Sequence, residues 1–268
     1  MVELLFNELA RLPEVEAIAL GGSRAEKNFD EKSDYDVYVY CTKGISESAR
    51  RNLLAAFCEK IETGNRFWEY EDNCTLIGGP DIDIIYRNLD AFLEGVSAVA
   101  ENFRAYNGYT TCLWHNLLNC KIIYDPLGRL AFAKKRFSIP FPEQLKKNII
   151  DRNFKLLHEA MPAYDNQIIK ALKRGDKVSV NHRVAAFLES YFDIIFALNG
   201  QTHPGEKRLM SLCRQNCEIL PENFEENLNS LFSHMFVSSK FTETDLKKII
   251  EELEKIIRPD GEGEKENS

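Results

Sequence analysis

The stretch GGSRAEKNFDEKSDYDVYVY, residues 21–40, decides how the first third of the chain folds. An apolar run at 15–20 leads into it, and Gly21 and Gly22 stop that run, which is typical of a strand that ends in a tight turn. The residues DYDVYVYC at 34–41 are rich in β-branched and aromatic side chains and predict a second strand. The stretch therefore predicts a strand, a turn and another strand, with a helix expected after the turn.

Two aspartates stand at the start of the second predicted strand. Asp34 and Asp36 are two residues apart, so a strand, which rises ~3.3 Å per residue, places both carboxylates on one face about 7 Å apart. A downstream strand, predicted at 82–86, brings two further aspartates, Asp81 and Asp83, either of which can supply a third carboxylate. Aspartate is disfavoured in strands, and like charges this close repel each other unless a cation lies between them. A site for one or two divalent cations explains the placement better than four solvated side chains do.

The composition excludes several classes of protein. With 268 residues, 44% hydrophobic and 28% charged, the chain is expected to be a folded globular protein of one or two domains. Its net charge of −8, with no block of Lys and Arg, disfavours binding to long nucleic acids, although a few local cations and a metal ion can hold a single triphosphate. The seven cysteines form neither a CxxC pair nor a zinc spacing, and no export signal or run of ~20 apolar residues is visible. We therefore expect a cytoplasmic protein with reduced thiols and no membrane partner.

Strands and helices alternate in the first third of the chain, and helices dominate after it. In addition to the two strands named above, helices are expected at 1–12 and 46–61, and strands at 66–70, 74–77 and 82–86. From about residue 89 the apolar spacing is helical, and helices are expected at 92–106, 109–118, 143–161, 167–174, 177–198, 206–214, 224–236 and 242–257. These patterns predict an α+β fold class, in which a mixed sheet with flanking helices is followed by an all-α helical bundle.

The boundary between these two parts is expected near residue 125. The residues DPLG at 125–128 and a pair of nearby prolines interrupt the helical pattern. We therefore expect a first domain at 1–125 and a helical C-terminal domain at 126–258. The last residues, 259–268, end in GEGEKENS, which has no apolar side chain to pack and predicts a disordered tail.

The order of these features resembles a known family. An apolar strand, Gly-Ser, a gap of about ten residues, Asp-x-Asp on a strand and a later strand aspartate resemble the nucleotidyltransferases of the DNA polymerase beta superfamily, and residues 21–40 match that pattern closely. Two later stretches, WHNLLNCKIIYDPLGRL at 114–130 and NHRVAAFLESYFDIIFALNGQTHPGEKRL at 181–209, resemble the helical C-terminal region of a bacterial group of nucleotidyltransferase-domain proteins. The two-domain plan is also similar to that of aminoglycoside and lincosamide adenylyltransferases. The resemblance implies a nucleotidyltransferase fold for the first domain.

The resemblance implies catalytic roles for three aspartates. Asp34 and Asp36 would bind Mg²⁺, with two ions expected, and an aspartate of a downstream strand would be the third metal ligand. Asp83 is preferred over Asp81 for that role, because the corresponding aspartate of the family commonly precedes apolar strand residues.

Four residues are predicted to bind the nucleotide. Gly22 and Ser23 would form the phosphate-binding turn, since glycine lets the backbone approach closely and free N–H groups at a helix start can bind phosphate oxygens. Arg24 follows the turn and either reaches the triphosphate or forms a salt bridge. Lys207 follows a Pro-Gly turn at the start of a predicted helix, where the similar adenylyltransferases have a lysine that contacts phosphate.

Two acidic residues lie in the most apolar predicted helix, at 177–198. Glu189 and Asp193 are one helical turn apart, and an unpaired carboxylate is costly in such surroundings. They therefore either pair internally or face the substrate cleft, where either one can act as general base toward an acceptor hydroxyl.

Together with the resemblance, these residues predict a Mg²⁺-dependent nucleotidyltransferase. It would transfer a nucleoside monophosphate from a nucleoside triphosphate, with ATP expected, to a hydroxyl group of a small molecule such as an antibiotic. The helical domain would select that acceptor. Two alternatives remain open: nucleotidylation of a protein, and a non-catalytic nucleotide-binding or antitoxin-like partner protein.

Overall fold

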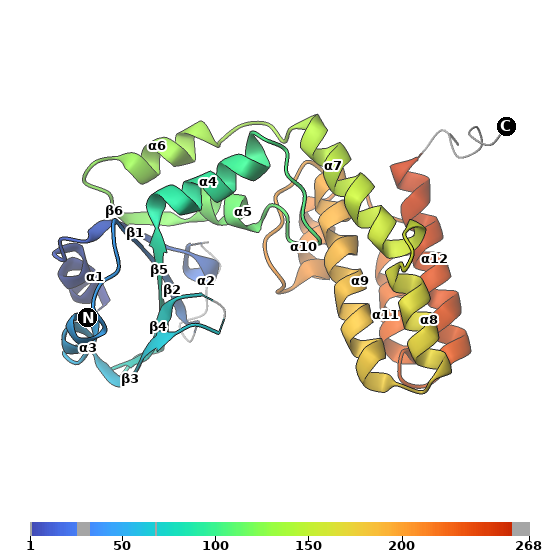
Figure 1. Ribbon diagram of the computed structural model, residues 1–268, viewed down its shortest axis with the longest axis horizontal. Helices are drawn as coiled ribbons and strands as arrows, with labels where there is room; N and C mark the ends of the chain where they lie inside the picture. Colours follow the sequence, from blue (N-terminus) through green and yellow to red (C-terminus); the bar gives the residue numbers. More distant parts are fainter. Residues whose placement is uncertain (1, 26–32, 68, 259–268) are drawn as a thin grey trace. The chain divides into compact units, whose positions relative to one another are not determined.

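The computed structural model describes residues 2–25, 33–67 and 69–258 (Figure 1). Contacts between residues divide the chain into two compact units. The first comprises 1–98 and 113–139, and the second comprises 99–112 and the described residues from 140 onward. The chain thus passes from one unit to the other three times, and the boundary predicted at residue 125 falls inside the second segment of the first unit. The predicted tail at 259–268 lies outside the described residues.

The first unit is built on a six-stranded mixed sheet (Figure 1). The strands lie in the order β3-β4-β5-β2-β1-β6, with the bounds β1 Val15–Leu20, β2 Tyr35–Cys41, β3 Cys58–Asn65, β4 Glu71–Leu76, β5 Asp81–Asn88 and β6 Lys121–Tyr124. The central pair, β2 and β5, is parallel, and the other neighbouring pairs are antiparallel. The predicted mixed sheet is therefore confirmed.

One face of this sheet packs against helices. Alternate residues of the two central strands, such as Val37 and Ile84, belong to a buried core on this side. Helices α1 (Val2–Ala10) and α3 (Glu47–Leu54) contribute further side chains to the same core, and we call this side the packed face. The other helices up to residue 139 are α2 Gly22–Ala25, α4 Leu89–Ala100, α5 Cys112–Asn119 and α6 Arg129–Arg136.

The opposite face of the sheet is covered at one end and polar at the other. At the C-terminal end of β2, the ring of Tyr40 lies 5.2 Å from that of Phe92 in α4. At the N-terminal ends of β2 and β5, the same face carries Asp36 and Asp83, and the neighbouring strand β4 adds Glu71. We call the part formed by these three carboxylates the acidic face.

The structure corrects the helix predicted at 46–61. Ser46 caps helix α3 as the sequence suggests, since its hydroxyl accepts the N–H of Ala49 at 3.3 Å. The helix then ends at Leu54, and the second half of the predicted segment becomes the edge strand β3. The helical spacing of the apolar residues is outweighed there by backbone pairing with β4, which satisfies the donors and acceptors that the two strands turn toward each other.

Strand β3 also replaces the strand predicted at 66–70. Ile61 of β3 pairs with Cys74 of β4, and none of the described residues within 66–70 lies in a strand. Strand β6 and helix α6 were not predicted. They lie between the helices predicted at 109–118 and 143–161. Four residues are too few for a recognisable period, and β6 forms because β1 offers it an antiparallel partner.

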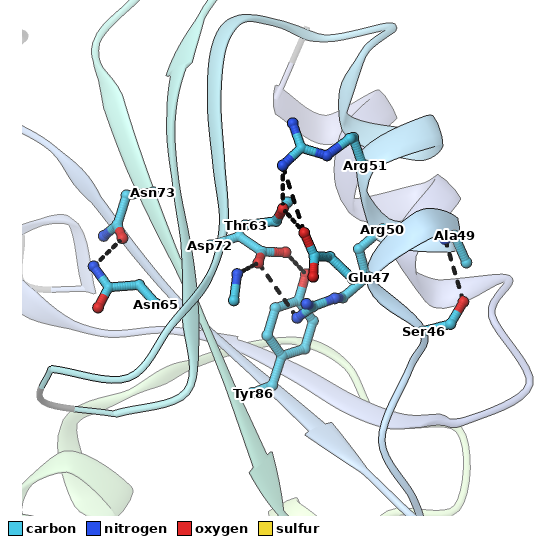
Figure 2. Close-up of polar contacts among 11 residues, drawn as sticks. Ser46, Glu47, Ala49, Arg50, Arg51, Thr63, Asn65, Asp72, Asn73 and Tyr86 are labelled. Carbon is cyan, nitrogen blue, oxygen red and sulfur yellow. Dashed lines mark hydrogen bonds and ion pairs between the residues drawn. The ribbon is translucent and has the colours of Figure 1, made fainter.

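A charged cluster is buried within the packed face (Figure 2). The carboxylate of Asp72 accepts hydrogen bonds from the Gly64 N–H at 2.8 Å and from the Tyr86 hydroxyl at 3.0 Å. The Nη1 atom of Arg50 lies 3.3 Å from Oδ1 of the same carboxylate, and both side chains are fully buried. The guanidinium also contacts the rings of Tyr70 and Tyr86, 4.7 and 4.8 Å from their centroids. The charge of Asp72 is therefore compensated from within the chain.

The second unit is helical, as predicted. Its elements from residue 140 onward are α7 Glu143–Phe154, the π-helical turn η1 Lys155–Glu159, α8 Tyr164–Lys173, α9 Lys177–Leu198, α10 Leu209–Asn216, α11 Phe224–His234 and α12 Ser239–Ile257. Helix α9 is buried along most of its second half and supplies a large share of the buried core, which is typical of a central helix. Across the described ranges, no helix combines the length and the apolar character needed to cross a membrane.

Candidate active site

The parallel pairing of β2 and β5 brings two predicted aspartates together. Asp36 is the register partner of Asp83, so both side chains lie on the acidic face at neighbouring positions. Asp81, the alternative third carboxylate, is the register partner of Thr75 and accepts a hydrogen bond from its hydroxyl at 2.7 Å. Of the two candidates, Asp83 is therefore the one that lies beside Asp36.

Asp34 lies just before β2 and is exposed. It lines a cavity of about 370 Å³ together with Asp81, Asp83 and Asn73. Within the described parts of the chain, no three side chains of His, Cys, Asp or Glu lie close enough together to hold a metal ion as a ready-made group. The donors nevertheless suit a hard cation such as Mg²⁺, which prefers carboxylate and amide oxygens.

The glycine turn lies directly against Asp36. The Gly21 N–H donates to the Asp36 carbonyl at 2.8 Å. A Cβ atom on Gly21 would meet the Tyr38 ring at 2.3 Å, and a Cβ atom on Gly22 would lie 1.9 Å from Oδ2 of Asp36. Gly22 also has a φ of +57°, in the left-handed region that favours glycine. The predicted turn and the predicted carboxylate are thus parts of one site, while the side chain of Ser23 lies outside the described part.

Arg24 connects this turn to the start of β2. Its Nε donates to the carbonyl oxygens of Ser33 at 2.7 Å and Asp34 at 3.2 Å. Its guanidinium lies 3.8 Å from the centroid of the Tyr35 ring. These contacts hold the backbone that presents Asp34, so the structure gives Arg24 a positioning role beside its predicted contact with the nucleotide.

Sequence reasoning missed two residues of the acidic face. Asn73 of β4 is the register partner of Asp83, donates to its Oδ1 at 2.7 Å and lies 3.4 Å from Oε1 of Glu71. Burial raises the pKa of Glu71, the charges of Asp83 and Asp36 raise it further, and the hydrogen bond from Asn73 lowers it. Residues 71–73, Glu-Asp-Asn, are all polar and show no alternation, so the strand predicted at 74–77 does not include them.

Asp193 pairs with other groups of the protein, which is the first of the two alternatives predicted for it. Its side chain is buried in the second unit and accepts hydrogen bonds from the Thr110 N–H at 3.0 Å, the Thr110 hydroxyl at 2.7 Å and Asn153 Nδ2 at 3.1 Å. Burial raises the pKa of this carboxyl to about 7, against the lowering effect of the three hydrogen bonds. The structure therefore corrects the cleft-facing alternative for Asp193, because no part of the carboxylate is left for a substrate.

Glu189 faces a cavity of about 590 Å³ within the second unit. The cavity is lined by apolar side chains such as Phe192 and Met210, and Tyr109, Glu206 and Arg208 add polar and charged groups. Burial raises the pKa of Glu189, and the charge of Glu206 raises it further. Of the two general-base candidates, Glu189 is thus the one that a small molecule can reach.

Lys207 lies in the turn before helix α10. Its side chain is exposed, and the helix predicted at 206–214 begins only at Leu209. Arg208, which precedes the helix, has a left-handed φ of 57°. Lys207, Glu189 and Asp193 belong to the second unit, whereas Asp34, Asp36, Asp83 and the glycine turn belong to the first.

Comparisons with known proteins agree with the geometry of the first unit. The nucleotidyltransferase domain family matches residues 2–106, and a domain of unknown function, DUF4037, matches residues 110–209. No curated protein matches the chain.

Two solved structures are similar to this chain. One is a nucleotidyltransferase-like protein from Exiguobacterium sibiricum 255-15, with 12% identity over 97% of this chain and 75% of that chain and a TM-score of 0.43. The other is an aminoglycoside 6-adenyltransferase from Bacillus subtilis, with 9% identity over 96% of this chain and 90% of that chain and a TM-score of 0.30. The two family models thus match consecutive parts of the chain, a nucleotidyltransferase domain at 2–106 and a DUF4037 domain at 110–209, and neither extends to residues 210–268.

Proposed function

We propose that this protein transfers a nucleoside monophosphate from a nucleoside triphosphate, with ATP as the expected donor, to a hydroxyl group of a small molecule. The observation that carries the proposal is the register of the parallel strands, which sets Asp36 beside Asp83 and against Gly22. Nucleotidyl transfer needs carboxylates for metal ions next to a backbone that phosphates can approach closely. The N-terminal ends of β2 and β5 supply both features.

In this proposal Asp34, Asp36 and Asp83 hold two Mg²⁺ ions. Bound Mg²⁺ supplies positive charge that offsets the charge of the triphosphate and of the leaving pyrophosphate. The turn of Gly22 and Ser23 binds phosphate oxygens through backbone N–H groups. Positioning and electrostatics then supply most of the rate, since no covalent intermediate with the protein is required.

The proposed reaction exchanges one bond for another at the α-phosphorus. The acceptor oxygen forms a bond to this atom, and the bond to the bridging oxygen of pyrophosphate breaks. The hydroxyl proton passes to a carboxylate, for which Asp83 and Glu189 are the candidates. Arg24 keeps the start of β2 in place, and Lys207 keeps its proposed role as a phosphate contact.

We assign recognition of the acceptor to the cavity at Glu189. Its apolar lining suits the body of a small organic molecule, and Glu189 and Glu206 suit a protonated amine or a cluster of hydroxyl groups. A cation bound there would also relieve the repulsion that raises the pKa of Glu189. The acceptor is therefore expected to be a polyhydroxylated or amine-bearing molecule, a class that includes antibiotics.

The cysteines support a cytoplasmic location for this protein. All seven are free thiols, and six of them are buried. Reduced thiols persist in the cytosol, whereas secreted proteins tend to form disulfides.

The proposal is tested by incubating the protein with α-labelled nucleoside triphosphates, Mg²⁺ and a panel of hydroxyl-bearing antibiotics and metabolites. We expect transfer of label by the natural protein and a loss of roughly 100-fold or more in Asp36→Asn and in Asp83→Asn. Mg²⁺-dependent triphosphate binding, measured by calorimetry, should weaken in the same two variants.

Asp81→Asn is the matched control, because Asp81 lies on the same strand and lines the same cavity but hydrogen-bonds to Thr75. This variant should transfer label at nearly the natural rate. Loss of transfer in Asp81→Asn with normal transfer in Asp83→Asn would show that the third carboxylate is Asp81. Normal transfer and binding in Asp36→Asn would contradict the proposed site itself.

A further inference from the structure

A cavity of about 660 Å³ in the second unit lies apart from every residue proposed above. It is bordered by the segment 103–107 and by the end of α7 and the start of η1. Three cationic side chains line it, Arg104, Arg152 and Lys155, against a single carboxylate, that of Asp151. The lining of this cavity therefore has an excess of positive charge, although the whole chain has a net charge of −8.

The three cations are not committed to carboxylates of the protein. Among the described residues, none of them forms an ion pair, although many other Lys and Arg side chains of this chain do. Asn107 accepts a hydrogen bond at 2.8 Å from Nε of Arg152, which orients the guanidinium and leaves its two terminal amino groups for another partner. Asp151 contributes one negative charge against the three cations, so the lining keeps an excess of positive charge.

The walls of this cavity are held in place by hydrogen bonds from α7. Asn148 Nδ2 donates to the carbonyl of Phe103 at 2.8 Å, and Asn153 Nδ2 donates to the carbonyl of Tyr106 at 3.0 Å. Oδ1 of the fully buried Asn153 also accepts the N–H of Gly108 at 3.0 Å. The segment that presents Arg104 is therefore fixed to the helix that presents Arg152. A fixed frame lowers the entropy that a ligand must remove on binding.

The helix changes its winding at this cavity. Lys155 is the first residue of the π-helical turn η1, which follows α7 without a break. Single π-helical turns are rare, and they occur frequently at functional sites.

We propose that this cavity binds a phosphate-bearing small molecule. Its phosphate groups would contact Arg104, Arg152 and Lys155, and its less polar part would lie against Phe103 and Leu156, which also line the cavity. A guanidinium fork matches two phosphate oxygens at once, and the excess of positive charge favours a ligand with at least two negative charges. A volume of about 660 Å³ lies within the range of small-molecule sites.

The test is calorimetric titration of the full chain with inorganic pyrophosphate, in EDTA and without Mg²⁺. We expect one saturable site whose affinity falls by about tenfold or more in the double variant Arg152→Gln/Lys155→Gln. Arg152→Lys keeps the charge but loses the fork, so it should lie between the natural protein and the double variant. A parallel titration with ATP under the same conditions shows whether a nucleotide is preferred over pyrophosphate.

The matched control is Lys170→Gln/Lys173→Gln, which removes two exposed charges from α8 of the same unit. Binding within twofold of the natural value in this control supports a specific site, and equal weakening in both double variants overturns it. Asp36→Asn should leave pyrophosphate binding unchanged, which separates this cavity from the proposed catalytic site. Absence of saturable binding by the natural protein would also overturn the proposal.

Discussion

Two consecutive residues of β4 place their carboxylates on opposite faces of the sheet, in opposite electrostatic conditions. Asp72 points into the packed face, where Arg50, the Tyr86 hydroxyl and the Gly64 N–H surround it (Figure 2). Burial raises the pKa of Asp72, and these three partners lower it. Burial outweighs them, so the pKa stays raised, but all three partners belong to the protein itself.

Glu71 points to the acidic face, where its neighbours are other carboxylates. Its pKa is raised by burial and by the charges of Asp83 and Asp36. Among the described residues, neither Glu71 nor Asp83 forms an ion pair with Lys or Arg, and the amide of Asn73 is the group that donates to them. A buried carboxylate with its own cation contributes to the fold, whereas carboxylates that crowd together favour a cation from outside. This difference is the physical reason to look for metal-dependent chemistry on the acidic face.

Replacement of Arg50 by methionine should have the largest effect on stability. The substitution leaves Asp72 buried without a cation, so the free energy of unfolding of the first unit should fall by about 3–5 kcal/mol. Both tryptophans of the chain fall within residues 1–139, so tryptophan fluorescence during urea unfolding reports on this unit. Arg51→Met is the control, because the Arg51 side chain is 52% exposed and pairs with Glu47 on the surface. Its cost should stay below about 1 kcal/mol. Equal losses in the two variants would contradict the role given to Arg50.

Asp193 is a buried carboxylate whose hydrogen-bond partners are neutral donors, in contrast to Asp72, which has Arg50. Its pKa in the folded protein is raised to about 7 from an ordinary value of 3.8. The stability that goes with the protonated form is therefore fully present below about pH 4 and is lost as the pH rises through 7. Relative to Asp193→Asn, the natural protein should lose up to about 4 kcal/mol of unfolding free energy between pH 4 and pH 7.5, at ~1.4 kcal/mol per pKa unit.

Urea unfolding followed by helical circular dichroism at several pH values measures this difference. Asp176→Asn provides a control of opposite sign. Asp176 caps α9 by accepting the Ser179 N–H at 3.0 Å, and the hydrogen bonds from Ser179 lower its pKa. Its contribution is therefore present at neutral pH and lost in acid. A difference between natural protein and Asp193→Asn that stays constant with pH would show that Asp193 does not titrate in this range.

The sequence was sufficient for the parts of the fold that rest on local pattern. The strand at 15–20 and the helix at 177–198 have the predicted bounds, because each is a mainly apolar segment between clear stop signals. The pattern misled at 46–61, where the apolar spacing suits a helix but the second half pairs with β4. Local spacing cannot reveal a partner strand, so the identity of the edge strand depended on the tertiary structure.

The candidate site shows the same limit. The Gly turn and Asp-x-Asp were readable because their chemistry is local, and the adjacency of Asp36 and Asp83 then follows from the parallel register. By contrast, Asp193 is satisfied by Thr110 and Asn153, which are 83 and 40 residues away in sequence. No periodicity predicts such partners.

Gly22→Ala tests the close contact between the glycine turn and the carboxylate of Asp36. The new Cβ atom would lie 1.9 Å from Oδ2 of Asp36, so the carboxylate must move and nucleotidyl transfer should fall by about tenfold or more. The left-handed φ of +57° adds a cost of roughly 1–2 kcal/mol in stability. Gly128→Ala is the matched control, because Gly128 has a φ of +66° with no atom within 4 Å of the added carbon. Gly128→Ala should show the stability cost without a loss of transfer. Equal transfer by Gly22→Ala and Gly128→Ala would contradict the role given to the contact with Asp36.

The smallest expected effect distinguishes the two faces most directly. Asp83→Asn removes one of several crowded charges and keeps an oxygen that can accept the hydrogen bond from Asn73. The free energy of unfolding at pH 7 should therefore stay the same or rise by up to about 1 kcal/mol, and the pKa of Glu71 should fall because one of its causes is gone. Asp72→Asn, which leaves the buried Arg50 uncompensated, should instead cost several kcal/mol, about 3–5.

Mg²⁺ adds an independent measurement to this pair of variants. A cation that binds the folded state alone raises its stability more, at a given concentration, the tighter it binds, so Mg²⁺ should raise the melting temperature of the natural protein and of Asp72→Asn more than that of Asp83→Asn. Asp83→Asn should thus lose metal response without losing stability, and Asp72→Asn should lose stability without losing metal response. If Asp83→Asn lost more than about 2 kcal/mol and kept its full response to Mg²⁺, Asp83 would be a structural carboxylate like Asp72. The acidic face would then have to hold its cation through Asp34, Asp36 and Glu71.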